Sequence, residues 1–501
     1  MPTWRETPGQ VASARPRHFF QQPVLIQLAV VEALTIGVLS IALAILDDAE
    51  PGAFALVKLA GACALGLFAV YAVVEAGAAS RSPQPPPAGR GPAPRPTAII
   101  PAYLPNEAPI IVETLMHHLT TGPSNLQLIL AYNSPHFLPI EEDLWRLADD
   151  HPRLTLLRVE DSRSKADNIN AAVDIATGDV IGVFDADHHP AADGYARANR
   201  WLAAGADVVQ GRCVVRRPEG PKPSLLAMAV TAEFEQMYSV GHPGRTRLTG
   251  IGLFGGSNGY WKAEALRSIR FDATALTEDI DASVRLLRMG GRIATDPGIV
   301  SAELAPPTLT SLCSQRLRWA QGWFQVGRRH LAGVMADRGL TVRKRLGVFW
   351  LWGWGTILPW IGALSLPLTL HGWFHQDRSP YSGAIRDILL FSTVAFLIHV
   401  GVAYRTAVSA RRRLVFAAYV LANVIFYGYL RVALSRLGHL HELAGRTAWM
   451  VTPRAAAAPA DTRIASHEDL LPRVAGLVTG LPSSDRLVPD LSGAHPATRS
   501  A

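Results

Sequence analysis

The strongest constraint on the fold of this chain is a set of long apolar stretches. Residues 23–46 carry one charged residue, Glu32, and residues 53–76 carry only Lys58 and Glu75. As a helix rising about 1.5 Å per residue, either stretch can cross a hydrocarbon core of roughly 30 Å. We therefore predict two transmembrane helices near the N-terminus. The alternative is a large soluble core, but soluble cores rarely use several runs of this length.

A second apolar block lies near the C-terminus. Its stretches are 346–371, 388–404 and 414–430. Pro359 and Pro367 interrupt the first of them, so one stretch could be interfacial or re-entrant instead of crossing the membrane. We predict a C-terminal membrane region and leave the number of its spans open.

Basic residues before the first span indicate the orientation. Arg5, Arg15 and Arg17 favour a cytoplasmic N-terminus, and two spans then return the chain to the cytoplasm. The first apolar run starts too late and is too long for a cleavable signal peptide. We predict an integral protein of the cell inner (plasma) membrane with a cytoplasmic middle domain. The predicted segments are a cytoplasmic N-terminal segment 1–22, two transmembrane helices in 23–80, a Pro-rich linker 81–96, the middle domain 97–342, the membrane region 343–434 and a basic, mostly disordered tail 435–501.

The middle region alternates strand-like and helix-like segments. The strand-like runs are 97–103, 126–132, 154–159, 180–184 and 206–215. The helix-like segments are 109–120, 141–149, 165–177 and 193–204. Such alternation predicts βαβ units, and therefore an α/β domain around a mainly parallel sheet. The strands are continuously apolar, as expected when helices cover both faces of the sheet.

Two carboxylates and an imidazole follow the fourth strand-like run. Asp185, Asp187 and His188 lie where ligands bind in an open parallel sheet, beyond the carboxyl ends of its strands. In an extended segment alternate side chains point the same way, so both carboxylates can face one cation. Oxygen ligands suit Mg²⁺ or Mn²⁺, and an imidazole ligand favours Mn²⁺. The alternative is an ordinary solvated turn.

Two later segments combine charged and aromatic residues on predicted helices. Asp279 lies near the start of a helix, where a carboxylate gains from the helix dipole and can be ordinary capping. Gln315, Arg318 and Trp319 are spaced three and four apart and therefore share one helix face. Alone, such a face is also typical of an amphipathic helix on a membrane.

Taken in order, DAD at 185–187, TED at 277–279 and QRLRW at 315–319 resemble the membrane-embedded family 2 glycosyltransferases. These include cellulose, hyaluronan, chitin and plant mannan synthases. The resemblance covers roughly residues 95–330 and the flanking membrane helices. It implies a GT-A (Rossmann-like) glycosyltransferase domain flanked by transmembrane α-helices, with interfacial helices near 308–340.

The resemblance also implies a role for each candidate residue. Asp185, Asp187 and His188 would hold Mg²⁺ or Mn²⁺ against the diphosphate of a nucleotide sugar, and Asp279 would be the general base. The acceptor- and diphosphate-binding residues would be Glu278, Gln315, Arg318 and Trp319. The nucleotide-binding residues would be Tyr103, Glu107, Asn133, Lys165 and Asp185. The segments 254–261 and 449–454 resemble the loop around the acceptor and the motif after the last span.

Two positions depart from the pattern of the family. Asn133 stands at the end of the second strand, where the family usually has Asp, and this leaves the identity of the base open. Asp167 stands where the Lys-Ala-Gly-Asn segment of the family has Gly.

The implied activity is an inverting transfer from a nucleotide sugar, UDP-linked by analogy, to a growing β-linked polysaccharide. A single displacement inverts the anomeric centre, so an α-linked donor gives a β-linked product. Two alternatives remain, a single addition to a lipid acceptor and a non-catalytic nucleotide-binding subunit of a synthase complex. A transporter is disfavoured because the spans carry few ionisable groups.

The expected partners follow from this activity. They are a nucleotide-sugar donor, a glycan or lipid acceptor, membrane lipids, and synthase or export subunits. The net charge of +7 comes without an aromatic-basic motif, so no nucleic-acid partner is expected.

Overall fold

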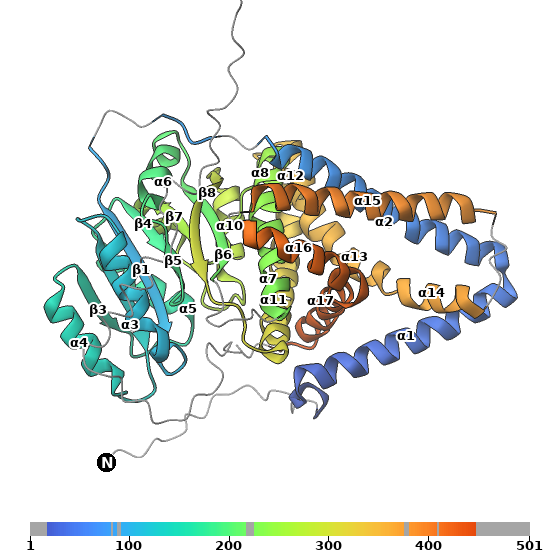
Figure 1. Cartoon of the computed structure of the whole chain (residues 1–501), viewed down its shortest axis with the longest axis horizontal. Coiled ribbons are helices and arrows are strands. Elements are labelled where there is room, and N and C mark those ends of the chain that lie inside the picture. The colour runs from blue at the N-terminus through green and yellow to red at the C-terminus, as the bar shows by residue number, and fades with distance from the viewer. Residues whose placement is uncertain are drawn as a thin grey trace, which may run out of the picture.

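The apolar stretches at the two ends of the chain form long helices that extend from one side of an α/β domain (Figure 1). The computed structural model describes residues 18–81, 84–87, 92–216, 225–374, 380–407 and 410–446. Within these residues, four helical stretches are long and apolar enough to cross a membrane. They are α1 (Val24–Ala49), α2 (Pro51–Ala79), the stretch Val342–Phe374 and α15 (Ser382–Thr406).

The third of these stretches is a broken helix. Its parts are α12 (Val342–Val348), the π-helical η3 (Phe349–Trp354), α13 (Gly355–Gly362) and α14 (Ser365–Phe374). Pro359 and Pro367 both lie within it, as expected for an interrupted span. Helix α14 packs against α1, and α15 packs against α2, so N-terminal and C-terminal helices are interleaved.

The third apolar block of the C-terminal region lies in a different helical run. Its parts are α16 (Ala410–Ala422), η4 (Asn423–Tyr427) and α17 (Gly428–Leu443). Our prediction of a disordered tail from residue 435 is wrong for its first residues, because α17 continues to Leu443. Leu437 is buried against α11, and the His441 ring lies 2.7 Å from the side-chain oxygen of Gln27. The segments 1–17 and 447–501, including 449–454, lie outside the described residues.

The middle domain is built on one eight-stranded sheet with the order β3-β2-β1-β4-β7-β6-β8-β5. The strands are β1 (Pro96–Tyr103), β2 (Gln127–Asn133), β3 (Leu154–Arg158), β4 (Val180–Val183), β5 (His189–Pro190), β6 (Val208–Val215), β7 (Gly259–Lys262) and β8 (Ile293–Glu303). The strands from β3 through β4 pair in parallel, as does β6 with β8. Strand β7 is antiparallel to both β4 and β6, and β5 is antiparallel to β8.

The sheet is therefore mixed. Our prediction of a mainly parallel sheet is wrong for β7 and β5, which run antiparallel to their neighbours. The sequence analysis missed β7 because four residues are too short for a clear pattern. It missed β8 because Asp296-Pro297-Gly298 reads as a turn inside that strand.

Helices cover both faces of the sheet. On one face lie α3 (Leu104–Thr121), α4 (Ile140–Asp150) and α6 (Gly194–Ala203), and on the other α5 (Lys165–Ile175), α9 (Ala263–Ile269) and α10 (Glu278–Arg288). Successive side chains of β1 point to opposite faces of the sheet. Ile100 packs in the core under α3, α4 and α6, and Ile99 packs in the core under α5, α9 and α10.

Four helical segments lie between the sheet and the long apolar helices (Figure 1). They are α7 (Leu225–Gln236), the π-helical η2 (Met237–Gly241), α8 (His242–Thr249) and α11 (Leu309–Ala336). Helix α11 packs along α17, and α8 packs against α2. This layer ties the α/β domain to the apolar bundle.

Candidate active site

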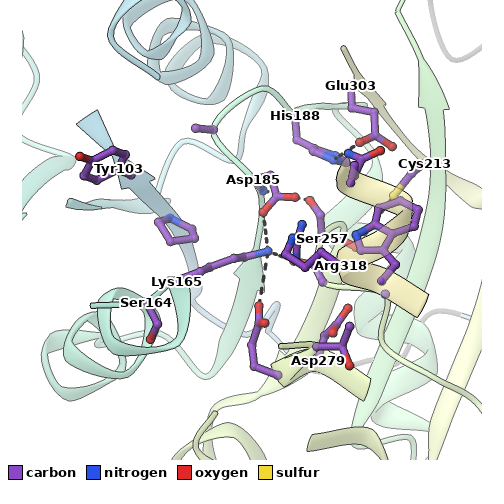
Figure 2. A pocket seen from close by; sticks show the side chains of 18 of the residues that line it. Tyr103, Ser164, Lys165, Asp185, His188, Cys213, Ser257, Asp279, Glu303 and Arg318 are labelled. Carbon is purple, nitrogen blue, oxygen red and sulfur yellow. Dashed lines mark hydrogen bonds and ion pairs between the residues drawn. The ribbon is translucent and has the colours of Figure 1, made fainter. Parts of the chain in front are cut away.

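Strands β1, β2 and β4 end at the same edge of the sheet because they are parallel, and a cavity of about 540 Å³ lies beyond that edge. Residues of α7, η2, α10 and α11 form its other wall. Every candidate site residue except Asp187 lines this cavity. Figure 2 shows the side chains of Asp185, Lys165, Asp279 and Arg318 converging on it.

The acidic pair lies in a turn directly after β4. Asp185 faces the cavity, and its backbone N–H donates to Ser257 Oγ over 3.0 Å. Asp187 is fully buried, and its Oδ2 accepts from the backbone N–H of Leu304 over 3.1 Å. The turn is closed by the His188 N–H, which donates to the Asp185 carbonyl oxygen over 3.0 Å.

Asp185, Asp187 and His188 lie together as predicted, but the structural reason that we gave for it is wrong. The segment is not extended, so the two carboxylates meet through a turn and not through strand alternation. One ligand atom from each of Asp185, Asp187 and His188 lies within 4.8 Å of the others. Two carboxylates and one imidazole at this spacing form a donor set that fits one Mg²⁺ or Mn²⁺ ion.

Lys165 is the cation that connects the two walls of the cavity. Its Nζ lies 2.5 Å from Asp185 Oδ1 and 3.9 Å from Glu278 Oε1, and it donates to the Gly256 carbonyl oxygen over 2.8 Å. Burial alone would lower the pKa of Lys165, but the charges of Asp185 and Glu278 outweigh burial and raise it. The ammonium therefore stays charged and is available to an anionic ligand.

The helix that carries Lys165 explains one departure from the family pattern. Ser164 caps α5 by accepting from the Asp167 N–H over 3.1 Å, and Asp167 Oδ2 accepts from the Arg163 N–H over 2.9 Å. Through these two bonds Asp167 holds the N-terminal end of the helix that presents Lys165.

Asp279 lies in the first turn of α10, on the wall opposite the acidic pair. Burial, followed by the negative charge of Glu278, raises the pKa of Asp279 to about 7, although Lys165 opposes the rise. Gly256 lies against this carboxyl group. It has a φ of +85°, and an added Cβ would approach Asp279 Oδ2 to 2.9 Å, so only glycine fits there. A carboxylate with this pKa can accept a proton near neutral pH.

Helix α11 presents Gln315, Arg318 and Trp319 to the cavity. Arg318 Nη1 donates to the Leu276 carbonyl oxygen over 3.4 Å, which links the helix to the segment before Asp279. Gly322 makes this approach possible, because a Cβ there would meet the Thr277 side chain at 2.6 Å.

An ion pair that sequence reasoning missed holds Trp319. The Arg316 guanidinium lies 4.1 Å from the Trp319 ring centroid and donates to Glu233 Oε2 over 2.8 Å. Arg316 also donates to Gln315 Oε1 over 2.8 Å. Although burial favours the neutral acid, Arg316 and Arg431 lower the pKa of Glu233 to about 2, so the pair is ionised. Arg316 lies inside QRLRW, so its position in the motif was a usable signal.

The end of the cavity beside β1 and β2 is formed by Tyr103, Glu107 and Asn133. Glu107 Oε2 accepts from the Tyr103 N–H over 2.7 Å and so caps α3. Asn133 Oδ1 accepts from Asn168 Nδ2 over 2.9 Å, and Asn133 Nδ2 donates to the Ser162 carbonyl oxygen over 3.4 Å. The orientation of the Asn133 amide is thus set by its neighbours.

Comparison with known families decides the assignment. The family described as "Glycosyl transferase family group 2" matches residues 180–451, more than half of the chain, and "Glycosyl transferase family 2" matches residues 97–261. The chain belongs to the family 2 glycosyltransferases. The match over the sheet domain confirms the predicted GT-A fold class, with apolar helices long enough to span a membrane on either side in the sequence.

Curated relatives of this glycosyltransferase are polysaccharide synthases. It is 30% identical over 196 residues to a "Cellulose synthase catalytic subunit [UDP-forming]" of Komagataeibacter sucrofermentans, covering 38% of this chain and 25% of that protein. It is 25% identical over 236 residues to a poly-β-1,6-N-acetyl-D-glucosamine synthase of Staphylococcus aureus, covering 46% of this chain and 56% of that protein. The matches thus span about a quarter to about half of the length of these relatives.

Among solved structures, a mannosyltransferase from Pyrobaculum calidifontis in complex with GDP-Man and Mn²⁺ superposes on this glycosyltransferase with a TM-score of 0.49. The identity is 21%, and the superposition covers 78% of this chain and 99% of that chain.

Proposed function

We propose that this glycosyltransferase transfers a sugar from a nucleotide sugar to a growing β-linked polysaccharide, with inversion at the anomeric carbon. The observation that carries the proposal is Asp279, whose pKa of about 7 suits a base at neutral pH, across the cavity from Asp185. UDP is the proposed nucleotide because the cellulose synthase relatives are UDP-forming.

Each wall of the cavity has its own part in the proposed reaction. On the sheet wall, Asp185, Asp187 and His188 would hold Mg²⁺ or Mn²⁺, which stabilises the charge of the leaving diphosphate. Lys165 and Arg318 add positive charge beside the same group, where it matters most as the bond breaks. On the helix wall, Asp279 removes the proton from the attacking hydroxyl, and Trp319 offers a ring face to the acceptor sugar.

The nucleotide lies at the end of the cavity formed by β1 and β2. Tyr103, Asn133 and Glu107 would contact its base and ribose, and Glu278 and Gln315 would complete the acceptor end. In this proposal donor and acceptor would lie on opposite sides of the transferred sugar, as a single inverting displacement requires.

The same proposal includes the placement in the membrane. Four spans return the chain to the side on which it started, so the N-terminal segment, the GT-A domain and the tail would all face the cytoplasm of the inner (plasma) membrane. Export of the product and further synthase subunits remain part of this proposal.

The test is a donor screen with the purified full chain in detergent. We expect one nucleotide sugar to give metal-dependent nucleotide release together with a ladder of products of increasing length. One discrete glycolipid would favour the single-addition alternative. Release from no donor, or nucleotide binding without transfer, would support the non-catalytic alternative and contradict the proposal.

A further inference from the structure

A second group of metal-ligating side chains lies beside the acidic pair. His188, Cys213 and Glu303 each offer one ligand atom within 4.8 Å of the others, and Figure 2 shows the three side chains pointing toward one another. All three line the cavity. The sequence analysis gave no role to Cys213 or Glu303.

The sheet itself brings these residues together. Strands β6 and β8 pair in parallel with Cys213 opposite Ser301 and Val215 opposite Glu303. Ser301 and Glu303 are two residues apart on β8 and therefore face the same side of the sheet, the side of Cys213. His188 comes from the turn before β5, which pairs with β8 at the same place.

The side chains around this group orient its donor atoms. His188 Nδ1 lies 3.0 Å from Ser301 Oγ, which turns Nε2 to within 3.3 Å of Glu303 Oε2. The Cys213 thiol donates to the Ser257 carbonyl oxygen over 4.0 Å. His188 and Cys213 are both 1% exposed. An imidazole whose second nitrogen is hydrogen-bonded is the usual arrangement of a metal-binding histidine.

We infer that His188, Cys213 and Glu303 form a second cation site that takes a thiophilic divalent ion such as Zn²⁺. In tetrahedral zinc sites, ligand atoms at about 2.0–2.3 Å from the metal lie roughly 3.3–3.8 Å apart, so a small rotation of the three side chains closes the site. Three protein ligands leave the fourth position open to the cavity. In the first site, by contrast, the ligands other than His188 are the carboxylate oxygens of Asp185 and Asp187, which suit a harder ion.

The two sites share His188, so they compete. One imidazole nitrogen cannot bind two ions, and an ion held by Cys213 and Glu303 withdraws His188 from Asp185 and Asp187. Resting on the proposed function, this competition makes Zn²⁺ an inhibitor of sugar transfer.

Cobalt(II) is the probe that reports on the thiolate directly. The chain has three cysteines, so the double variant Cys63→Ser and Cys313→Ser leaves Cys213 as its single thiol. In this protein we expect one Co²⁺ per chain, with a thiolate-to-cobalt charge-transfer band in the near ultraviolet, and loss of that band when Zn²⁺ is added. Cys213→Ser in the same background should remove the band. Glu303→Gln removes a direct ligand and should weaken Co²⁺ binding by at least the roughly 10- to 100-fold that loss of an outer-shell partner costs.

Asp187→Ala is the matched control, since it removes a ligand of the acidic pair and should leave the band in place. Absence of the band in the single-thiol protein would overturn the inference, as would loss of the band in Asp187→Ala with no change in Glu303→Gln. Because absorption does not depend on sugar transfer, this test can fail while the donor screen succeeds, and the reverse. Inhibition by Zn²⁺ that persists unchanged in Cys213→Ser would contradict the competition.

Discussion

The two walls of the active-site cavity hold their charged side chains in different ways. On the sheet wall, Asp185 contacts Lys165 and Asp187 accepts a backbone N–H, so each carboxylate is compensated where it stands. On the helix wall, Asp279 lies beside a second acid, Glu278, and its pKa rises to about 7. The first wall suits a bound cation and a diphosphate, and the second suits a proton acceptor.

Lys165 lies close to acidic side chains of both walls. Its Nζ is 2.5 Å from Asp185 and 3.9 Å from Glu278, so a ligand that attracts this ammonium changes the charge balance on both sides. The difference between the walls therefore predicts separate kinetic signatures for their variants.

The largest effect is expected on the helix wall, for Asp279→Asn. Loss of the general base should lower kcat by about 10²- to 10⁴-fold while nucleotide-sugar affinity persists. Folding raises the pKa of this carboxyl, so the ionised group lowers stability above its ordinary pKa, and the Asn variant should unfold at the same or a higher temperature at neutral pH. Turnover with radiolabelled donor and thermal unfolding are the measurements.

Asp272→Asn, which changes an acid outside the cavity on the segment before α10, is the control. Near-normal turnover in Asp279→Asn would contradict the assignment of the general base to the helix wall.

Asp185→Asn should show the signature of the sheet wall. We expect sugar transfer to fall by about 10²- to 10³-fold, because a group that stabilises the charge of the leaving diphosphate is lost. Unlike Asp279→Asn, this variant should also bind Mn²⁺ more weakly, which titration calorimetry measures. Asp193→Asn, at the start of α6 and away from the cavity, should change neither quantity. Unaltered Mn²⁺ affinity in Asp185→Asn would remove the metal from this wall.

Arg316→Leu tests whether the helix wall depends on its buried ion pair. The guanidinium stacks on Trp319 and bonds Glu233, and a cation–π contact contributes about 0.5–2 kcal/mol, or roughly 2- to 30-fold. We expect the acceptor KM to rise within that range with the donor KM unchanged, and Arg316→Lys to recover part of the loss. A change in the donor KM alone would contradict the assignment of Arg316 to the acceptor-binding helix wall.

Asn133→Asp is expected to give the smallest effect, at the nucleotide end of the sheet wall. The carboxylate would still accept from Asn168. Its second oxygen would lose the bond that Asn133 Nδ2 donates to the Ser162 carbonyl oxygen and would offer the base an acceptor in place of an N–H donor. One hydrogen bond contributes about 1 kcal/mol, so the donor KM should change by about fivefold and the preference among bases should shift. Donor kinetics across UDP-, GDP- and CDP-sugars measure this. An unchanged preference would remove Asn133 from base recognition.

The first half of the domain could be predicted from sequence because its signals are local. Continuous apolar runs gave the strands from β1 to β4, and Asp185 directly after such a run marked the edge where ligands bind. The second half depends on contacts between distant segments. Cys213 lies in a predicted strand without a chemical motif, and Glu303 lies in a strand that was not predicted. Only the pairing of β6 with β8 places them beside His188.

The electrostatics of the site were also beyond the sequence. The pKa of Asp279 is raised because α10 packs against the 255–258 loop and buries its carboxyl group. The motif TED does not encode this packing. The same holds for Arg316 and Glu233, which are far apart in the chain and meet only because α7 and α11 pack together.

The pH dependence of kcat/KM tests the central claim most directly, because it reports the ionisation of the base in the free enzyme. Asp279 acts only when ionised, so we predict that kcat/KM falls as the pH drops through about 7. The negative charge of Glu278 helps raise that pKa, so Glu278→Gln should move the acid limb to lower pH. An acid limb at the ordinary pKa of a carboxyl group, or one that Glu278→Gln leaves in place, would contradict the account.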